Sequence, residues 1–164
     1  MELKSIEFKL KKSQNLLERL KKYKEEFLKR YGGIDNLSYE DLEEDERLKE
    51  LMDLLILNYS KVQSIIGEKL FKEVLEYAGI DINKKFVEIL VILEREGILN
   101  NVYEWSEIRE LRNSFSHEYP EEFEEMMANL SLLLENIDKL QEVYNNVKKY
   151  YIETKKVLDE SRNT

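Results

Sequence analysis

The chain has 164 residues, which is the usual size of one domain and enough to bury a core. It contains no cysteine, which excludes disulfides, cysteine-ligated zinc, iron–sulfur clusters and a thiol nucleophile. The formal net charge of −9 has the wrong overall sign for a nucleic-acid binder. One proline and five glycines leave few turns, so we expect a few long helices rather than a strand-rich fold.

The N-terminal sequence, MELKSIEFKLKK, has neither the apolar stretch nor the cleavage site of a signal peptide. The most apolar runs, residues 54–57 and 86–93, are far too short to span a bilayer. We therefore expect a cytoplasmic protein that does not associate with membranes.

Residues 2–30 predict the first helix, because apolar side chains recur there at three- and four-residue steps. The stripe consists of Leu3, Ile6, Leu10, Leu17, Leu20, Phe27 and Tyr31. Gly32 and Gly33 follow, and glycine tolerates the left-handed backbone geometry of a helix end. We expect the helix to stop at these two glycines.

A polar loop is expected next, followed by a second helix from Asp45 to about Ala78. Residues 54–57 of this helix are apolar nearly all round. Such a turn lies either in the middle of a bundle or in a subunit interface. Gly79 ends the helix.

A third helix is predicted over residues 84–96, with Asn83 as its N-cap and Gly97 at its end. Its apolar run also fits a strand, but its length and flanking charges favour a helix. A fourth helix is predicted over residues 102–117. Pro120 forces its end, because the residue before proline is pushed out of the helical region.

The fifth helix is predicted from Glu121 into the 150s, and residues 161–164 are expected to fray. No linker, repeat or low-complexity tract divides the chain, so residues 1–164 are predicted to form a single helical domain. Long helices joined by short loops indicate an all-α, up-and-down four-helix bundle with additional helical segments.

Charge is distributed unevenly along the chain. The first 30 residues contain ten basic and five acidic side chains. The basic ones are Lys4, Lys9, Lys11, Lys12, Arg19, Lys21, Lys22, Lys24, Lys29 and Arg30. Acidic side chains are concentrated at residues 40–50 and 118–125. A basic helix can meet phosphate, but a merely solvated face is the commoner explanation of such a run.

His117 is the single histidine of the chain. One histidine cannot supply a di-metal carboxylate site, and the sequence HEYPE is not a His-Glu-x-x-His zinc motif. A phosphate-binding glycine loop is also missing. We therefore expect no metal and no cofactor, and the chemistry of the chain is sought among the neighbours of the histidine.

Helical spacing sorts those neighbours onto two faces. The core stripe contains Ile108, Leu111 and Phe115. The opposite side carries a guanidinium, an amide and an imidazole, on Arg112, Asn113 and His117, with Ser116 between them and the phenol of Tyr119 just beyond.

These groups suit attack of a ribose 2′-hydroxyl on its own phosphodiester. The imidazole of His117 titrates near neutral pH and can transfer a proton, and the guanidinium of Arg112 matches phosphate oxygens. A plainer alternative stays open: a histidine near a helix C-terminus is often only a favourable charge on the helix dipole. A Ser114–His117 pair has no identifiable orienting acid.

The pattern Arg112, four residues, His117, any residue, Tyr119 resembles the signature of the HEPN superfamily. Asn113 directly after the arginine, and Trp105 seven residues before it, also fit. The nearest similarity is to HepT-like toxins and to nucleotidyltransferase substrate-binding proteins. The motif covers eight residues, and the helical pattern extends the resemblance over most of the chain.

The resemblance implies a metal-independent endoribonuclease with a composite site across a homodimer. Arg112 and His117 would be the catalytic pair, with Asn113 in support. In HepT-like toxins the motif tyrosine is AMPylated by a partner nucleotidyltransferase antitoxin (MNT type), and this role would fall on Tyr119. The acidic residues 118–125 depart from expectation, because they would repel RNA.

Three hypotheses follow. The first is a toxin-like endoribonuclease paired with a nucleotidyltransferase. The second is a non-catalytic helical partner that presents nucleotide or substrate to that enzyme. The third is a purely structural helical bundle, which predicts neither RNA cleavage nor a complex.

Overall fold

The computed structural model describes residues 2–116 and 122–162. These residues form an all-α structure with no strand among them, which confirms the fold class predicted from the sequence. The elements in chain order are α1 (Glu2–Tyr31), α2 (Tyr39–Glu44), α3 (Glu46–Ser64), the π-helix η1 (Ile65–Leu70), α4 (Phe71–Tyr77), α5 (Phe86–Arg95), α6 (Val102–Ser116) and α7 (Phe123–Arg162).

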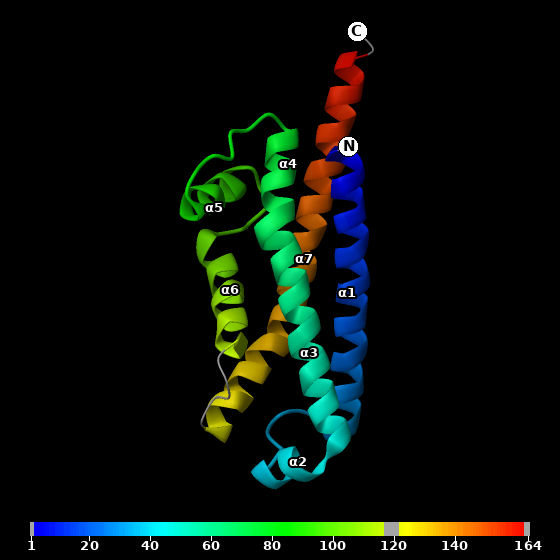
Figure 1. The fold of residues 1–164 in the computed structure, drawn as a ribbon, viewed down its shortest axis with the longest axis vertical. Helices are drawn as coiled ribbons and strands as arrows, with labels where there is room; N and C mark the ends of the chain where they lie inside the picture. Colours follow the sequence, from blue (N-terminus) through cyan, green and yellow to red (C-terminus); the bar gives the residue numbers. More distant parts are fainter. Residues whose placement is uncertain (1, 117–121, 163–164) are drawn as a thin grey trace.

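The long helices run alternately down and up the long axis of the molecule (Figure 1). The first, α1, descends, α3–η1–α4 ascends as one continuous rod, α6 descends, and α7 ascends. The α3 helix contacts α1, α6 and α7. In Figure 1 it lies between α1 and α6, so its outer surface is flanked by both. The short α5 packs on α6, and α2 lies at the end of the bundle where α1 and α3 meet.

A single cluster of buried apolar side chains connects the helices. Its largest fully buried members are Trp105, Tyr59, Phe27 and Phe71. Each such side chain removed from water stabilises the fold by about 1.5–3 kcal/mol, so this cluster is the main cause of the bundle's stability. The apolar run at residues 54–57 contains both buried and exposed side chains: Leu55 is fully buried, while Leu57 is 49% exposed.

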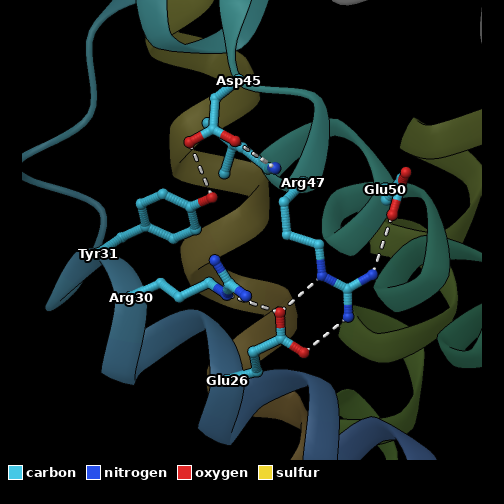
Figure 2. Close-up of polar contacts among 7 residues, drawn as sticks. Glu26, Arg30, Tyr31, Asp45, Arg47 and Glu50 are labelled. Atoms are coloured by element: carbon cyan, nitrogen blue, oxygen red, sulfur yellow. Dashed lines mark hydrogen bonds and ion pairs between the residues drawn. The ribbon is translucent and has the colours of Figure 1, made fainter.

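Ion pairs fix the reversal from α1 into α3. Gly32 ends α1 with a φ of 70°, as the sequence predicted. Figure 2 shows the Glu26 carboxylate held from two sides, by Arg47 Nε at 2.6 Å and by Arg30 Nε at 2.8 Å. Tyr31 also donates to Asp45 Oδ2 over 3.0 Å. The last turn of α1 is thereby attached to the first turn of α3.

The sequence prediction of a plain loop before residue 45 was wrong in part, because α2 forms there. A capping box starts it: Asp41 N donates to Ser38 Oγ over 3.2 Å, and Ser38 N donates to Asp41 Oδ2 over 2.9 Å. These two bonds satisfy backbone donors that a helix start otherwise leaves unpaired. The helix buries no residue, so it was invisible to an argument based on apolar spacing.

The predicted N-cap at Asn83 was also wrong. The Asn83 backbone N–H donates to Asp81 Oδ1 over 2.9 Å, inside the preceding turn. Lys85 is the N-cap, and its N–H donates to Glu88 Oε2 over 3.1 Å. The segment is a helix and not a strand, as predicted, and Gly97 follows it with a φ of 81°.

The C-terminal helix is longer than expected. It continues to Arg162, where the sequence predicted fraying from residue 161. Its last turns project past the beginning of α1 (Figure 1). Within the described ranges, none of the helices combines the length and the apolar character that crossing a membrane requires.

Candidate functional site

Helix α6 carries the described part of the motif. Asn101 starts it, accepting a 2.8 Å hydrogen bond from Glu104 N. Ile108 and Leu111 are buried, Arg112 is half-buried and Asn113 is exposed, as the helical spacing predicted. His117 and Tyr119, the other two predicted site residues, lie outside the described residues.

A buried network fixes α6 in place. The Tyr59 hydroxyl donates to Ile108 O over 3.0 Å and accepts from Asn136 Nδ2 over 3.2 Å. Burial raises the pKa of Tyr59 well above its ordinary value, and the hydrogen bond from Asn136 acts in the opposite direction. The phenol therefore stays protonated and joins α3, α6 and α7 one turn before Arg112.

The π-helix η1 packs directly against α6 at Gly67. A Cβ atom at this position would lie 2.7 Å from Trp105 Cζ2, so only glycine leaves room for the fully buried indole. Phe71 meets the same indole edge to face, with ring centroids 4.7 Å apart. The wider turn of a π-helix changes the direction of the side chains that follow it, and such turns are frequent at functional sites.

Glu68 follows Gly67 directly and reaches Arg112. The Arg112 Nη1 atom donates to Glu68 Oε1 over 2.9 Å. The two side chains are 31% and 57% exposed respectively, so the pair stands at the surface and remains open to solvent. Glu68 could not be identified from the sequence, since no local pattern connects it to an arginine on another helix.

Beside this ion pair lies an open pocket of about 310 Å³ on the outer surface of α3. Three helices contribute a cation to it: Lys12 comes from α1, Lys61 from α3 and Arg112 from α6. The remaining lining residues are Leu57, Ser60, Ser64 and Ile65. None of these lining residues is acidic, although the chain as a whole has 35 acidic and 26 basic side chains.

Lys12 and Lys61 are exposed, and neither forms an ion pair within the part of the chain that the structure describes. No carboxylate of the described residues is therefore ion-paired with either of these two lysines at the pocket. The sequence analysis had included Lys12 in the basic N-terminal run but had not connected it to the motif. Lys61 was missed, because no sequence pattern connects this lysine of α3 to the other cations.

The acidic helix α2 and the acidic residues 122–125 at the start of α7 lie together at one end of the bundle. Tyr39 of α2 and Phe123 of α7 meet edge to face, with ring centroids 6.4 Å apart. This contact places the acidic α2 beside the acidic start of α7. The exposed carboxylates there are Glu40, Glu43, Glu44, Glu122, Glu124 and Glu125. The molecule thus has an acidic end and, at the side of α3, a basic pocket.

Among residues 2–116 and 122–162, no group of three or more histidine or carboxylate side chains is arranged to hold a metal ion. The side chains that gather around the pocket are hydrogen-bond donors and cations, which suit an anionic ligand. The fold and the pocket together define an all-α helical bundle with a basic pocket at its surface.

No protein-family model matches the chain, and neither a curated protein nor a solved structure matches it. The similarity of residues 112–119 to the HEPN signature stays a prediction from the sequence.

Proposed function

We propose that the chain is a HEPN-type endoribonuclease that cleaves RNA without a metal ion and acts as a homodimer in the cytoplasm. The observation that carries the proposal is the position of Arg112. Of the motif residues that the structure describes, 112–116, Arg112 is the one that lines the basic pocket, and it lies on the helix that leads towards His117. An RNA phosphate in the pocket would therefore lie against the residue that the motif assigns to charge stabilisation.

The proposed reaction is an internal transesterification. The His117 imidazole removes the proton of a ribose 2′-hydroxyl, and the oxygen attacks the adjacent phosphorus. A 2′,3′-cyclic phosphate forms, the bond to the 5′-oxygen breaks, and that oxygen takes a proton from the second His117 of the dimer. Arg112 stabilises the negative charge that builds on the phosphoryl oxygens, and Asn113 supports it as a hydrogen-bonding residue.

The proposed partner is an MNT-type nucleotidyltransferase antitoxin. It would transfer AMP from ATP to the Tyr119 hydroxyl, with release of pyrophosphate, and so silence the nuclease. An added phosphate next to His117 repels the RNA phosphate and blocks the site.

The test is cleavage of single-stranded RNA in the presence of EDTA. We expect His117→Ala to lower the cleavage rate by about 10²- to 10⁴-fold, the usual contribution of a general acid–base group. Arg112→Ala should lower it by about 10²- to 10³-fold. Arg109→Ala is the matched control: this arginine lies on the same helix but covers the Phe86 ring at 4.5 Å, away from the pocket. Wild-type protein that leaves RNA intact would disprove the nuclease proposal.

A second candidate is the non-catalytic partner of a nucleotidyltransferase. The Arg112–Glu68 ion pair favours it, because Glu68 already neutralises the guanidinium that the reaction needs. The acidic end of the bundle would also repel RNA while attracting a basic protein surface. This candidate predicts no RNA cleavage by the wild-type chain together with a stable complex between the two proteins.

A further inference from the structure

We propose that Lys12 and Lys61 form a phosphate-binding subsite beside Arg112, which holds the RNA backbone next to the phosphate being cleaved. This inference rests on the proposed function and extends it from the motif to a second part of the molecule. The motif occupies residues 112–119, whereas the two lysines belong to α1 and α3.

The pocket that the two lysines share with Arg112 is positively charged. Three cations from three helices meet around one pocket, and none of its described lining residues carries a carboxylate. Like charges brought together cost free energy unless an anion or solvent compensates them. In a chain with nine more acidic than basic side chains, this local reversal of sign indicates a surface for an anion.

Lys12 and Lys61 are available to bind an anion. Glu68 holds Arg112, but Lys12 and Lys61 have no ion-pair partner among residues 2–116 and 122–162. Their ammonium groups can therefore bind phosphate oxygens without first breaking a protein contact. The half-buried Ser60 and Ser64 lie on the same wall, and hydroxyls of this kind commonly donate to phosphate oxygens.

The uncharged residues that line the pocket indicate which part of the RNA binds there. Leu57 and Ile65 are aliphatic, and none of the residues that line the pocket carries an aromatic ring. Bases bound in single strands normally stack on aromatic side chains, and the described residues that line the pocket provide none. The subsite therefore recognises the backbone and not the base, and its contribution to binding is independent of RNA sequence.

The position of Arg112 indicates the direction in which a bound RNA strand would run. Arg112 borders both Glu68 and the pocket. An RNA strand with one phosphate bound at Arg112 can therefore continue in either of two directions. One leads towards the carboxylate of Glu68, which repels it. The other leads across α3 towards Lys61 and Lys12. We infer that the strand runs over the outer surface of α3 from α6 to α1.

The test measures binding of a fluorescein-labelled single-stranded RNA 12-mer by anisotropy, in the full-length His117→Ala background so that the RNA is not cut. The test variant is Lys12→Gln/Lys61→Gln. The matched control is Lys148→Gln/Lys149→Gln on α7, which removes the same charge from two exposed lysines outside the pocket. Binding is followed over a series of KCl concentrations.

Each phosphate contact in a single-strand complex contributes about 0.7 to the slope of log K against log salt concentration. The test variant should therefore lose about 1.4 from this slope, and the control should keep the slope of the parent. Equal slopes for the test and control variants would overturn the subsite, and so would a parent protein that binds no RNA.

Two further measurements distinguish the backbone subsite from a mononucleotide site and test the subsite separately from the nuclease activity. Inorganic phosphate and AMP are titrated against the 12-mer complex, and we expect neither to displace it at concentrations comparable to that of the RNA. Displacement by AMP at such concentrations would mean a mononucleotide site and would overturn the backbone subsite. Cleavage by the wild-type protein is scored independently: cleavage with no slope difference refutes only the subsite, and a slope difference without cleavage refutes only the nuclease.

Discussion

Arg112 on α6 and Glu68 in the π-helix η1 form an ion pair with an Nη1–Oε1 distance of 2.9 Å. Gly67, the residue before Glu68, lets the π-helix approach Trp105 of α6 closely. The ion pair ties the motif arginine to a helix far away in the sequence. It also sets a competition, since a phosphate and the Glu68 carboxylate need the same guanidinium.

Replacing Glu68 by glutamine should release Arg112 for phosphate. An exposed ion pair is worth at most about 1 kcal/mol, so Glu68→Gln should tighten RNA binding by about two- to fivefold. The measurement is anisotropy with the labelled 12-mer in the His117→Ala background. Glu76→Gln, an exposed carboxylate further along the same rod, serves as the control for charge alone. Identical affinities in the two variants would show that Glu68 does not compete for Arg112.

Gly67→Ala should destabilise the protein by about 1–3 kcal/mol, even though alanine normally favours a helix. The added Cβ would lie 2.7 Å from Cζ2 of Trp105, whose indole is fully buried, so one of the two groups would have to shift. Urea unfolding followed by circular dichroism measures the change.

Trp105→Phe provides the partner for a double-mutant cycle with Gly67→Ala. The substitution removes the ring atoms that the new methyl group would meet, so the double variant should lose less stability than the sum of the single variants. Strict additivity would mean that the steric conflict at this contact is not the cause of the loss.

Tyr59→Phe should lower the free energy of unfolding by about 1–3 kcal/mol, because it leaves the buried Asn136 amide without its acceptor. It also removes the bond to Ile108 O that positions α6. Tyr103→Phe removes a hydroxyl from a side chain that is 79% exposed and should change stability by less than about 0.5 kcal/mol. A comparison of urea midpoints tests this, and equal midpoints for the two variants would contradict it.

Glu26 should make the fold sensitive to acid. The hydrogen bonds from Arg47, followed by the charge of Arg47 and the contact with Arg30, lower the pKa of Glu26 from 4.5 to about 2, against a smaller opposing effect of burial. A carboxyl whose pKa is lower in the folded than in the unfolded state stabilises the fold above its unfolded pKa. That contribution is lost as the pH falls from about 4.5 towards 2.

The test compares thermal midpoints of wild-type and Glu26→Gln protein between pH 6 and pH 2.5. The wild type should be the more stable at pH 6, and the difference should shrink steadily as the pH falls. Glu25→Gln, at the exposed neighbouring position, should follow the wild-type curve. A difference between wild type and Glu26→Gln that stays constant with pH would rule out this linkage.

Much of the fold follows from the sequence alone, for local reasons. Apolar spacing predicted the long helices, and Gly32, Gly79 and Gly97 marked ends at which φ is indeed positive. The same 100° step per residue placed Ile108 and Leu111 inside and Arg112 towards solvent. The start of α2 was missed, although a serine followed three residues later by an acid is a capping signal.

What only the tertiary structure decided are the relationships between helices. Nothing local connects Glu68 to Arg112, or brings Lys12 and Lys61 to one pocket with it, because these side chains meet only after the helices pack. The π-helix also depends on packing: its glycine is explained by the indole of Trp105, a residue of another helix. Helical periodicity determines which face a side chain occupies, while the packed core determines which faces meet.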